Sequence, residues 1–460
     1  MTIRRYVLIF LTLFLATGFG KNLERLSRTI LSNYELLDIH MDGLTAYITG
    51  GLGGLNIVDL NDPLNPLVLG EYQASGCDWG RIYAWATYGN YAFGTGRDCG
   101  IHVINVSNLN NPQHIQTYHA GGDIRYEHPT VQGSSLFVAR HQDGIEILSL
   151  DDPTNITPVT VIPTFNAWAS LAEDSILFVA DGTAGLNIIN IGNATQPTRR
   201  ASLTTTGSAR DLDKSGDFLF IAVGAAGVDM IDVGDPYNPI FIDNYNTTGF
   251  ASRVAVNESL VAVSDWDDVE VLSYSATGLE LMAYKNTGGR VMAIAMHDDI
   301  IYSAEWIKFQ TFRINENLTV DIDFPARKLE FPRIANGSQG IVNLIVENTG
   351  AEYLTIDDIQ IQSSTFTIPI PTDPIAPGDS IALPVTYIPN GSTWNSNAIF
   401  YSNATDEPAA STLLIGNYPY GPMPRDPAPS FDLAVVNGTG NLSWDDLLGN
   451  PAVIAFFTGW

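Results

Sequence analysis

Apolar and polar positions repeat in one short pattern along the first two thirds of the chain. Residues 185–191 read glycine, apolar, polar, two apolar, polar, apolar, and Pro197 follows a few residues later. Copies begin at residues 54, 100, 144, 185 and 227, and divergent copies begin at 268 and 308, so the steps between them are 40 to 46 residues. A repeat of this period predicts a radial or stacked array of one structural unit.

Each repeat is predicted to contain four short strands. In the fifth repeat these are residues 209–214, 218–223, 228–233 and 240–245, separated by turns rich in glycine, aspartate and proline. Four-stranded repeats in a radial arrangement predict an all-β fold, a seven-bladed β-propeller over residues 22–316. A β-solenoid is the alternative, but its repeats are usually shorter and lack this turn scheme.

The repeats are out of phase with the predicted blades. Residues 26–31 look like the fourth strand of a blade, whereas the array ends at residues 309–314, which look like a third strand. We expect these two segments to pair, because the pairing would complete the last blade and leave neither edge exposed.

The repeated phrase also resembles a known family. Gly-Leu-x-Ile-x-Asp-Leu followed by Asp-Pro and Asn-Pro, as in residues 54–66, resembles the LVIVD repeat. The resemblance implies a propeller-like fold and an extracellular or surface-associated protein, and it says almost nothing about chemistry.

A different kind of β-structure is predicted after the repeats end. Residues 324–417 alternate short strands and turns and predict a β-sandwich. Residues 347–350, 376–380 and 387–389 resemble immunoglobulin-like modules of the Hydin-like or choice-of-anchor type, which implies a spacer or an adhesive surface. Residues 418–427 form a proline-rich linker.

The C-terminal residues 428–460 resemble the opening of a redoxin, a branch of the thioredoxin-like α/β proteins. In that family a Cys-x-x-Cys motif follows the tryptophan that ends a core strand; here the sequence ends at that residue, Trp460, and Asn450 replaces the usual lysine. We therefore expect an incomplete thioredoxin-like domain and a longer parent protein.

Charge and the N-terminal residues narrow the class of protein. The net charge of −28 disfavours nucleic acid and anionic lipid as partners. Residues 1–20 read as a signal peptide, because Arg4 and Arg5 precede an apolar run, residues 6–16, that is too short to span a bilayer. An uncleaved anchor is the alternative. We expect a monomer in an extracellular, periplasmic or cell-surface location, with no membrane span after signal cleavage.

The two cysteines are predicted to pair. Cys77 and Cys99 lie in loops that open on the same face of a propeller, and an exported protein enters an oxidising compartment.

Other candidate chemistry is weak. The acidic turns at Asp59, Asp62, Asp232 and Asp235 lack EF-hand spacing, the histidines lack zinc spacing, and no Gly-x-Ser-x-Gly motif occurs. We therefore predict no catalytic residue, metal or cofactor in this chain.

Arginines and tryptophans form the one pattern that indicates binding. They lie at or just before the predicted inner strands, or in loops of the same face, and they predict a site for a protein or an anionic ligand at one mouth of the central channel. Pairing of the arginines with neighbouring aspartates is the alternative. The residues are Trp79, Arg81, Arg125, Trp168, Arg210, Arg253, Trp266 and Arg290.

Two function hypotheses follow from these features. The first is a secreted or cell-surface binding protein built on a propeller. The second is a thiol-disulfide oxidoreductase or peroxide-reducing protein in full length, with the propeller as its docking platform. A propeller hydrolase or lyase is a third possibility for which the sequence offers no catalytic constellation.

Overall fold

The computed structural model describes residues 22–32, 35–50, 54–74, 81–96, 99–266, 268–287, 290–306, 308–315, 319–325, 328–391, 394–417, 432–434 and 441–443. Every regular element in these ranges is a β-strand, as the sequence predicted for the main part of the chain. None of these residues belongs to a helix that could cross a membrane. The described residues do not include the predicted signal peptide, Cys77, Trp79 or the predicted linker, and they include only six residues of the redoxin-like segment.

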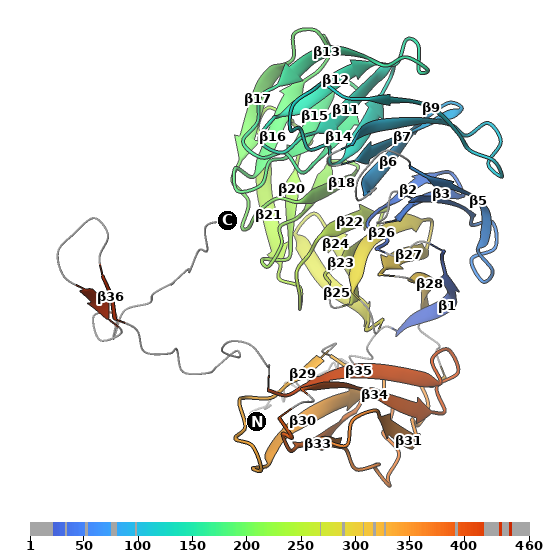
Figure 1. The fold of residues 1–460 in the computed structure, drawn as a ribbon, viewed down its shortest axis with the longest axis vertical. Helices are drawn as coiled ribbons and strands as arrows, with labels where there is room; N and C mark the ends of the chain where they lie inside the picture. The colour runs from blue at the N-terminus through green and yellow to red at the C-terminus, as the bar shows by residue number, and fades with distance from the viewer. Residues whose placement is uncertain are drawn as a thin grey trace, which may run out of the picture.

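The chain from β1 to β28 folds into repeated four-stranded antiparallel sheets, which Figure 1 shows arranged around a common centre. The first three are β2 (Ile39–Asp42), β3 (Thr45–Gly50), β4 (Gly54–Asp59) and β5 (Leu67–Gln73); β6 (Ile82–Tyr88), β7 (Tyr91–Gly96), β8 (Gly100–Asn105) and β9 (Gln113–Tyr118); and β10 (Pro129–Gln132), β11 (Ser135–Ala139), β12 (Ile145–Ser149) and β13 (Thr157–Ile162).

The following sheets repeat the same order. They are β14 (Ala169–Glu173), β15 (Ile176–Ala180), β16 (Leu186–Asn190) and β17 (Thr198–Leu203); β18 (Asp211–Ser215), β19 (Phe218–Ala222), β20 (Val228–Asp232) and β21 (Ile240–Tyr245); β22 (Arg253–Val256), β23 (Leu260–Ser264), β24 (Val269–Ser275) and β25 (Gly278–Lys285); and β26 (Val291–His297), β27 (Ile300–Glu305) and β28 (Lys308–Asn315) with β1 (Asn22–Ile30).

The glycine that opens each copy of the sequence pattern is required by the backbone. Gly185 and Gly227 have φ angles of 80° and 86°, a region that residues with a side chain rarely adopt. A Cβ atom on either glycine would lie 2.4 Å from the Leu203 oxygen or 2.0 Å from the Tyr245 oxygen, on the fourth strand of the same sheet. The glycine therefore permits both the turn and the close approach of that strand.

The N-terminal strand completes the last sheet. β1 pairs antiparallel with β28 in the order β1-β28-β27-β26, with Arg28 opposite Gln310 and Thr29 opposite Phe309. The expected pairing of residues 26–31 with 309–314 is therefore present, although the strand begins earlier, at Asn22.

Residues 328–415 form a second unit of two sheets around one core. One sheet has the order β29-β35-β34-β31 and the other β30-β33-β32. Buried side chains from both sheets, among them Val346, Phe400 and Leu414, share a single hydrophobic cluster. The strands are β29 (Lys328–Glu330), β30 (Gly340–Glu347), β31 (Ile356–Ile361), β32 (Phe366–Thr367), β33 (Ser380–Tyr387), β34 (Asn395–Ser402) and β35 (Ala409–Ile415), and farther along the chain β36 (Asp432–Ala434) pairs with β37 (Asn441–Ser443).

Buried ion pairs join the second unit to the repeated sheets, which lie beside it in Figure 1. Lys285, the last residue of β25, is fully buried, and its Nζ lies 2.6 Å from Asp321 Oδ1, 3.5 Å from Asp406 Oδ2 and 3.8 Å from Glu407 Oε2. Arg25 of β1 lies 2.6 Å from the same Glu407. The contact between the two units therefore includes a network of buried charges.

Candidate functional site

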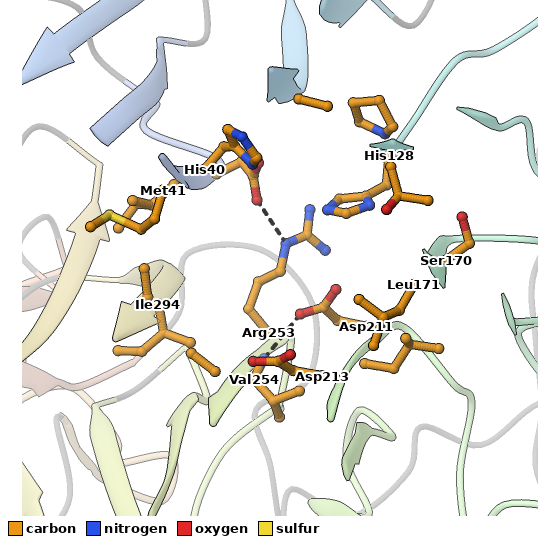
Figure 2. A pocket seen from close by; sticks show the side chains of 18 of the residues that line it. His40, Met41, His128, Ser170, Leu171, Asp211, Asp213, Arg253, Val254 and Ile294 are labelled. Carbon is orange, nitrogen blue, oxygen red and sulfur yellow. Dashed lines mark hydrogen bonds and ion pairs between the residues drawn. The ribbon is translucent and has the colours of Figure 1, made fainter. Parts of the chain in front are cut away.

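The first strand of each sheet lines a central cavity. Neighbouring inner strands contact one another around a complete circle, from β2 through β6, β10, β14, β18 and β22 to β26 and back to β2. The cavity that they enclose measures about 440 Å³ and is shown in Figure 2. Corresponding residues of different repeats therefore meet at the axis, although they are about 40 residues apart in sequence.

Arg253 lies at the centre of this channel between carboxylates. Its Nε is 3.4 Å from Asp38 Oδ1, and Asp211, whose Oδ2 accepts a hydrogen bond from the Val254 N–H at 3.0 Å, faces it in Figure 2. Burial alone would lower the pKa of Arg253, but Asp211 and Asp38 outweigh it and the pKa is raised. Burial raises the pKa of Asp38 to about 6, against the opposing effect of Arg253.

Two histidines in the channel are held in the neutral form. Burial lowers the pKa of His40 to about 4. Burial, with the charges of Arg253 and His40, lowers the pKa of His128 to about 3. These two histidines therefore add no positive charge to that of Arg253 at neutral pH.

These histidines predict acid sensitivity, which a His128→Gln variant tests. In the folded protein both pKa values lie below the ordinary value near 6.5, so the unfolded chain binds more protons between about pH 4 and 6.5. Stability is fully present above that range and is lost as pH falls, by up to roughly 1.4 kcal/mol per pH unit for each histidine. Asp38 and Asp213, whose pKa values burial raises to about 6, oppose part of this loss.

Urea denaturation at several pH values measures the effect. His128→Gln should lose less stability on acidification than the unsubstituted protein, and a variant of the exposed His119 should behave like the unsubstituted protein. Parallel curves for all three proteins would contradict the prediction.

A smaller cavity of about 150 Å³ lies at the N-terminal ends of the inner strands and forms the mouth of the channel. One residue at the start of each inner strand, or one or two positions before it, lines this cavity, and these residues occupy one level of the repeat. They are Leu37, Tyr83, Glu127, Trp168, Arg210, Ser252 and Met292. The lining also includes Phe250, Trp266 and Arg253. Arg253 lines the larger cavity of the channel as well.

Aromatic rings and guanidinium groups contact one another in sequence around this mouth, edge to face between His141 and Trp168 and stacked between Phe250 and Trp266. The rings of His141 and Trp168 meet at 4.5 Å, and Arg210 Cζ lies 4.1 Å from the Trp168 ring and 5.5 Å from the Phe250 ring. Phe250 stacks on Trp266 at 4.5 Å, and Arg290 Cζ lies 3.8 Å from the Trp266 ring. We call this series the rim ladder; it comprises His141, Trp168, Arg210, Phe250, Trp266 and Arg290.

Two members of the rim ladder occupy a costly backbone conformation. After the second strand of four consecutive sheets, the corresponding residues are His141, Gly182, Gly224 and Trp266, with φ angles of 52°, 59°, 69° and 71°. Glycine adopts this conformation without strain, whereas another residue costs about 1–2 kcal/mol. Strain of this kind clusters at functional sites. The two bulky residues at these positions are the ones whose rings join the rim ladder.

The mouth contains hydrogen-bond donors that have no acceptor. Nε1 of Trp168, Nε1 of Trp266 and Nε of Arg210 are buried and make no hydrogen bond. Leaving a buried donor unpaired costs about 1–3 kcal/mol. Burial lowers the pKa of Arg210, and the carboxylate of Glu127 opposes the shift. The arrangement therefore suits a ligand that supplies acceptor atoms and negative charge.

The predicted site residues divide into two groups. Trp168, Arg210, Trp266 and Arg290 come together in the rim ladder. Arg253 lines both cavities but lies against Asp38. For this residue the structure agrees with the alternative interpretation, in which the arginines pair with aspartates of the protein.

Two other arginines lie apart from the rim ladder. Arg81 is exposed and pairs with Glu35 at 3.1 Å. Arg125 is exposed in the loop before β10 and lines neither cavity. Trp79 lies outside the described residues. Cys77 does too, so the disulfide to Cys99 stays a prediction.

Sequence reasoning missed Phe250, His141 and Glu127. His141 Nε2 lies 2.5 Å from Glu127 Oε1, so these two residues form one unit at the mouth. Aligning the repeats on Ala209 and Ala251, which bridge to Gly182 and Gly224, would have placed Phe250 beside the inner strand.

The acidic turns considered for calcium have a structural role. Asp62 Oδ1 accepts the Leu64 N–H at 3.0 Å, and Asp235 Oδ1 accepts the Tyr237 N–H at 3.0 Å. Each aspartate thus closes the loop between the third and fourth strands of its sheet.

Comparison with protein families identifies both parts of the chain. Residues 85–120, 175–205 and 206–247 match the family model of the LVIVD repeat, and residues 322–415 match DUF1573, described as a protein of unknown function. The chain therefore contains LVIVD repeats, as predicted, and a DUF1573 domain. No curated protein matches the chain.

Solved structures show the same architecture at low sequence identity. The crystal structure of the mitotic checkpoint complex contains a chain with a TM-score of 0.52 and 10% identity, covering 68% of this chain and 99% of that one. The β-propeller domain of Cps50 (Swd1) from Myceliophteria thermophila has a TM-score of 0.51 and 12% identity, covering 63% of this chain and 100% of that domain. At these identities the likeness shows the fold alone, a β-propeller.

Proposed function

We propose that the protein is an exported binding protein whose propeller has seven blades and holds an acidic peptide segment at the rim ladder. The single observation that carries this proposal is the set of buried, unpaired donors on Trp168, Trp266 and Arg210. Carboxylate oxygens would satisfy them, since carboxylates accept hydrogen bonds from both arginine and indole groups.

The stacking of the arginines supports the choice of ligand. A guanidinium that lies on an aromatic ring uses its face, so its N–H edge can bind a carboxylate in a bidentate manner. Arg210 stacks in this way on Trp168, and its Nε makes no hydrogen bond. The chain as a whole has a net charge of −28, so an acidic segment would bind preferentially at the arginines of the rim ladder.

Binding is favoured over hydrolysis by the contacts of the mouth residues. Ser252 Oγ is hydrogen-bonded to Ser264 Oγ at 3.0 Å, and the His141 imidazole is engaged with Glu127. Among the described residues of the mouth, no serine is held by a histidine in the manner of a hydrolase.

Substitution of the stacked arginines tests the proposal. Binding of fluorescent peptides rich in glutamate is measured by anisotropy and by the change in tryptophan fluorescence. Arg210→Ala and Arg290→Ala should each weaken binding roughly 10- to 100-fold, because a hydrogen bond to a charged group contributes about 1.5–3 kcal/mol. The matched control is Arg200→Ala, which removes an arginine stacked on Tyr237 from the outer strand β17 and should leave binding unchanged.

A second comparison separates charge recognition from general adhesion. Peptides in which glutamine replaces glutamate should bind far more weakly, and added salt should weaken binding of the glutamate peptides. Equal binding of both peptide series, or no binding of either, would refute an acidic ligand.

The redox hypothesis remains the second candidate because residues 428–460 resemble the start of a redoxin. The cysteines of the sequence, Cys77 and Cys99, do not have Cys-x-x-Cys spacing. An insulin-reduction assay on the full-length protein tests this idea, and inactivity would remove it. We further propose that the DUF1573 domain is an immunoglobulin-like support that holds the propeller through the Lys285 ion pairs.

A further inference from the structure

We propose that Asp265, Asp268 and Glu270 form a calcium-binding site in the sheet made by β22 to β25. The three side chains are buried, with exposed fractions of 0%, 2% and 1%. One carboxylate oxygen from each lies within 4.8 Å of the others, a separation that a single cation can bridge.

Two oxygens in this cluster point to a missing partner. Oδ1 of Asp268 and Oε2 of Glu270 are buried and accept no hydrogen bond. The opposite side of the cluster is well held, since Glu270 Oε1 accepts the Thr248 N–H at 2.8 Å and Asp265 Oδ2 accepts the Gly249 N–H at 2.7 Å. The backbone thus orients the carboxylates and leaves two oxygens for a ligand.

The repeats provide an internal comparison. The residue that closes the turn before the third strand is Arg140 in the β10–β13 sheet and Asp265 in the β22–β25 sheet, each donating its N–H across the same turn. In the first case Arg140 Nη1 lies 3.1 Å from Oε2 of the buried Glu146, which occupies the position of Glu270. A bound cation would supply the positive charge that Arg140 supplies in that sheet.

In a third sheet, the β14–β17 sheet, the side-chain amide of Asn187 is the partner of the buried carboxylate. Asp181 occupies the position of Asp265, and its carboxylate accepts a hydrogen bond from Asn187, which occupies the position of Glu270. Only acids stand at these positions in the β22–β25 sheet, and burying several carboxylates together without compensation is strongly unfavourable.

The donor set selects the kind of cation. All three side chains offer carboxylate oxygens, and the hydroxyl of Thr248 lies 2.9 Å from Glu270 Oε1 and 3.1 Å from Asp265 Oδ2. Oxygen donors in this number favour a hard divalent ion, and calcium tolerates irregular geometry with water completing its shell.

The site would also fix part of the mouth. Trp266 lies between Asp265 and Asp268 in the chain, and the Phe250 N–H donates to the Asp265 carbonyl oxygen at 2.5 Å. A cation at the cluster would therefore hold the turn that carries two members of the rim ladder. Metal binding can be measured without any peptide, so the test below is independent of the proposed function.

Calcium titration of the full chain is the decisive experiment. Protein stripped with EDTA is titrated with CaCl2 by calorimetry, its Tm is followed as calcium rises, and Tb3+ is used as a luminescent probe that a nearby tryptophan sensitises. We expect one calcium ion per chain, a Tm that rises with calcium, and terbium luminescence that falls in Trp266→Phe while calcium binding remains.

Variants complete the design. Asp268→Asn and Glu270→Gln should each weaken calcium binding at least about tenfold, whereas Asp235→Asn, at an exposed turn, should bind as the unsubstituted protein does. Absence of both calorimetric heat and a Tm shift in the unsubstituted protein would overturn the proposal. So would unchanged calcium binding in both cluster variants. If one variant does not fold, the other variant and the terbium signal of the unsubstituted protein decide.

Discussion

Replacing Lys285 with methionine is expected to destabilise the folded chain by about 3–5 kcal/mol, because it removes one partner of a buried ion network. Burial alone would lower the pKa of Lys285, but Asp321, with Asp406 as the next contributor, outweighs it and the pKa is raised. Without the ammonium group these carboxylates would stay buried and uncompensated.

The position of Lys285 adds a second expectation. It belongs to β25 of the propeller, whereas Asp321 and Asp406 belong to the segment before the DUF1573 domain strands and to a loop within that domain. The substitution should therefore loosen the contact between the two units as well as lower the total stability.

Urea denaturation and limited proteolysis measure both effects. Lys214→Met is the matched control, because Lys214 pairs with the exposed Glu173 at 2.6 Å and such a surface pair contributes about 0–1 kcal/mol. Adding Asp321→Asn to Lys285→Met should recover part of the lost stability, since it removes one uncompensated charge. A loss below about 1 kcal/mol in the Lys285 variant would show that the network does not stabilise the fold.

Removal of residues 22–31 is expected to abolish the stable monomer. This segment forms β1, which covers the edge of β28 and buries Leu23 and Leu31. Each leucine contributes about 1.5–3 kcal/mol of burial, and the exposed edge would offer unpaired backbone groups to other chains. We expect aggregation or oligomers by size-exclusion chromatography and a lower Tm.

A complementation experiment makes the strand prediction specific. A synthetic peptide of residues 22–31 added to the truncated chain should restore the monomer by strand addition, whereas a scrambled peptide should not. A truncated chain that stays monomeric with an unchanged Tm would mean that β1 is dispensable.

The repeated sheets were predictable because their signals are local and recur. The glycine at 185 and its counterparts mark the turn and the close approach to the fourth strand, and the phase of residues 26–31 indicated closure. In the DUF1573 domain the β34 and β35 strands give a weaker signal in the sequence. Their buried positions include Ser396, Ala398 and Thr412, which give little hydrophobic alternation.

The rim ladder was only half predictable because it depends on contacts between neighbouring sheets. The arginine and tryptophan of one repeat could be placed near the mouth, but the stacking of Arg210 on Trp168 depends on the spacing of two repeats. The sequence alone does not indicate that Asp265 and Asp268 lie close to Glu270, because this proximity depends on the geometry of the turn.

One level of the inner strands joins a constant backbone to variable chemistry. Trp168, Arg210 and Ser252 each donate the same hydrogen bond to the second strand of their own sheets, at 2.9, 2.9 and 2.8 Å, yet their side chains have nothing in common. Because the backbone hydrogen bond does not involve the side chain, evolution could replace the mouth-lining residue of one sheet without disturbing the others. Single substitutions at this level would change the side chains that line the mouth and keep the backbone hydrogen bonds of the sheets. Related chains could therefore acquire new ligands through a few substitutions without a change of fold.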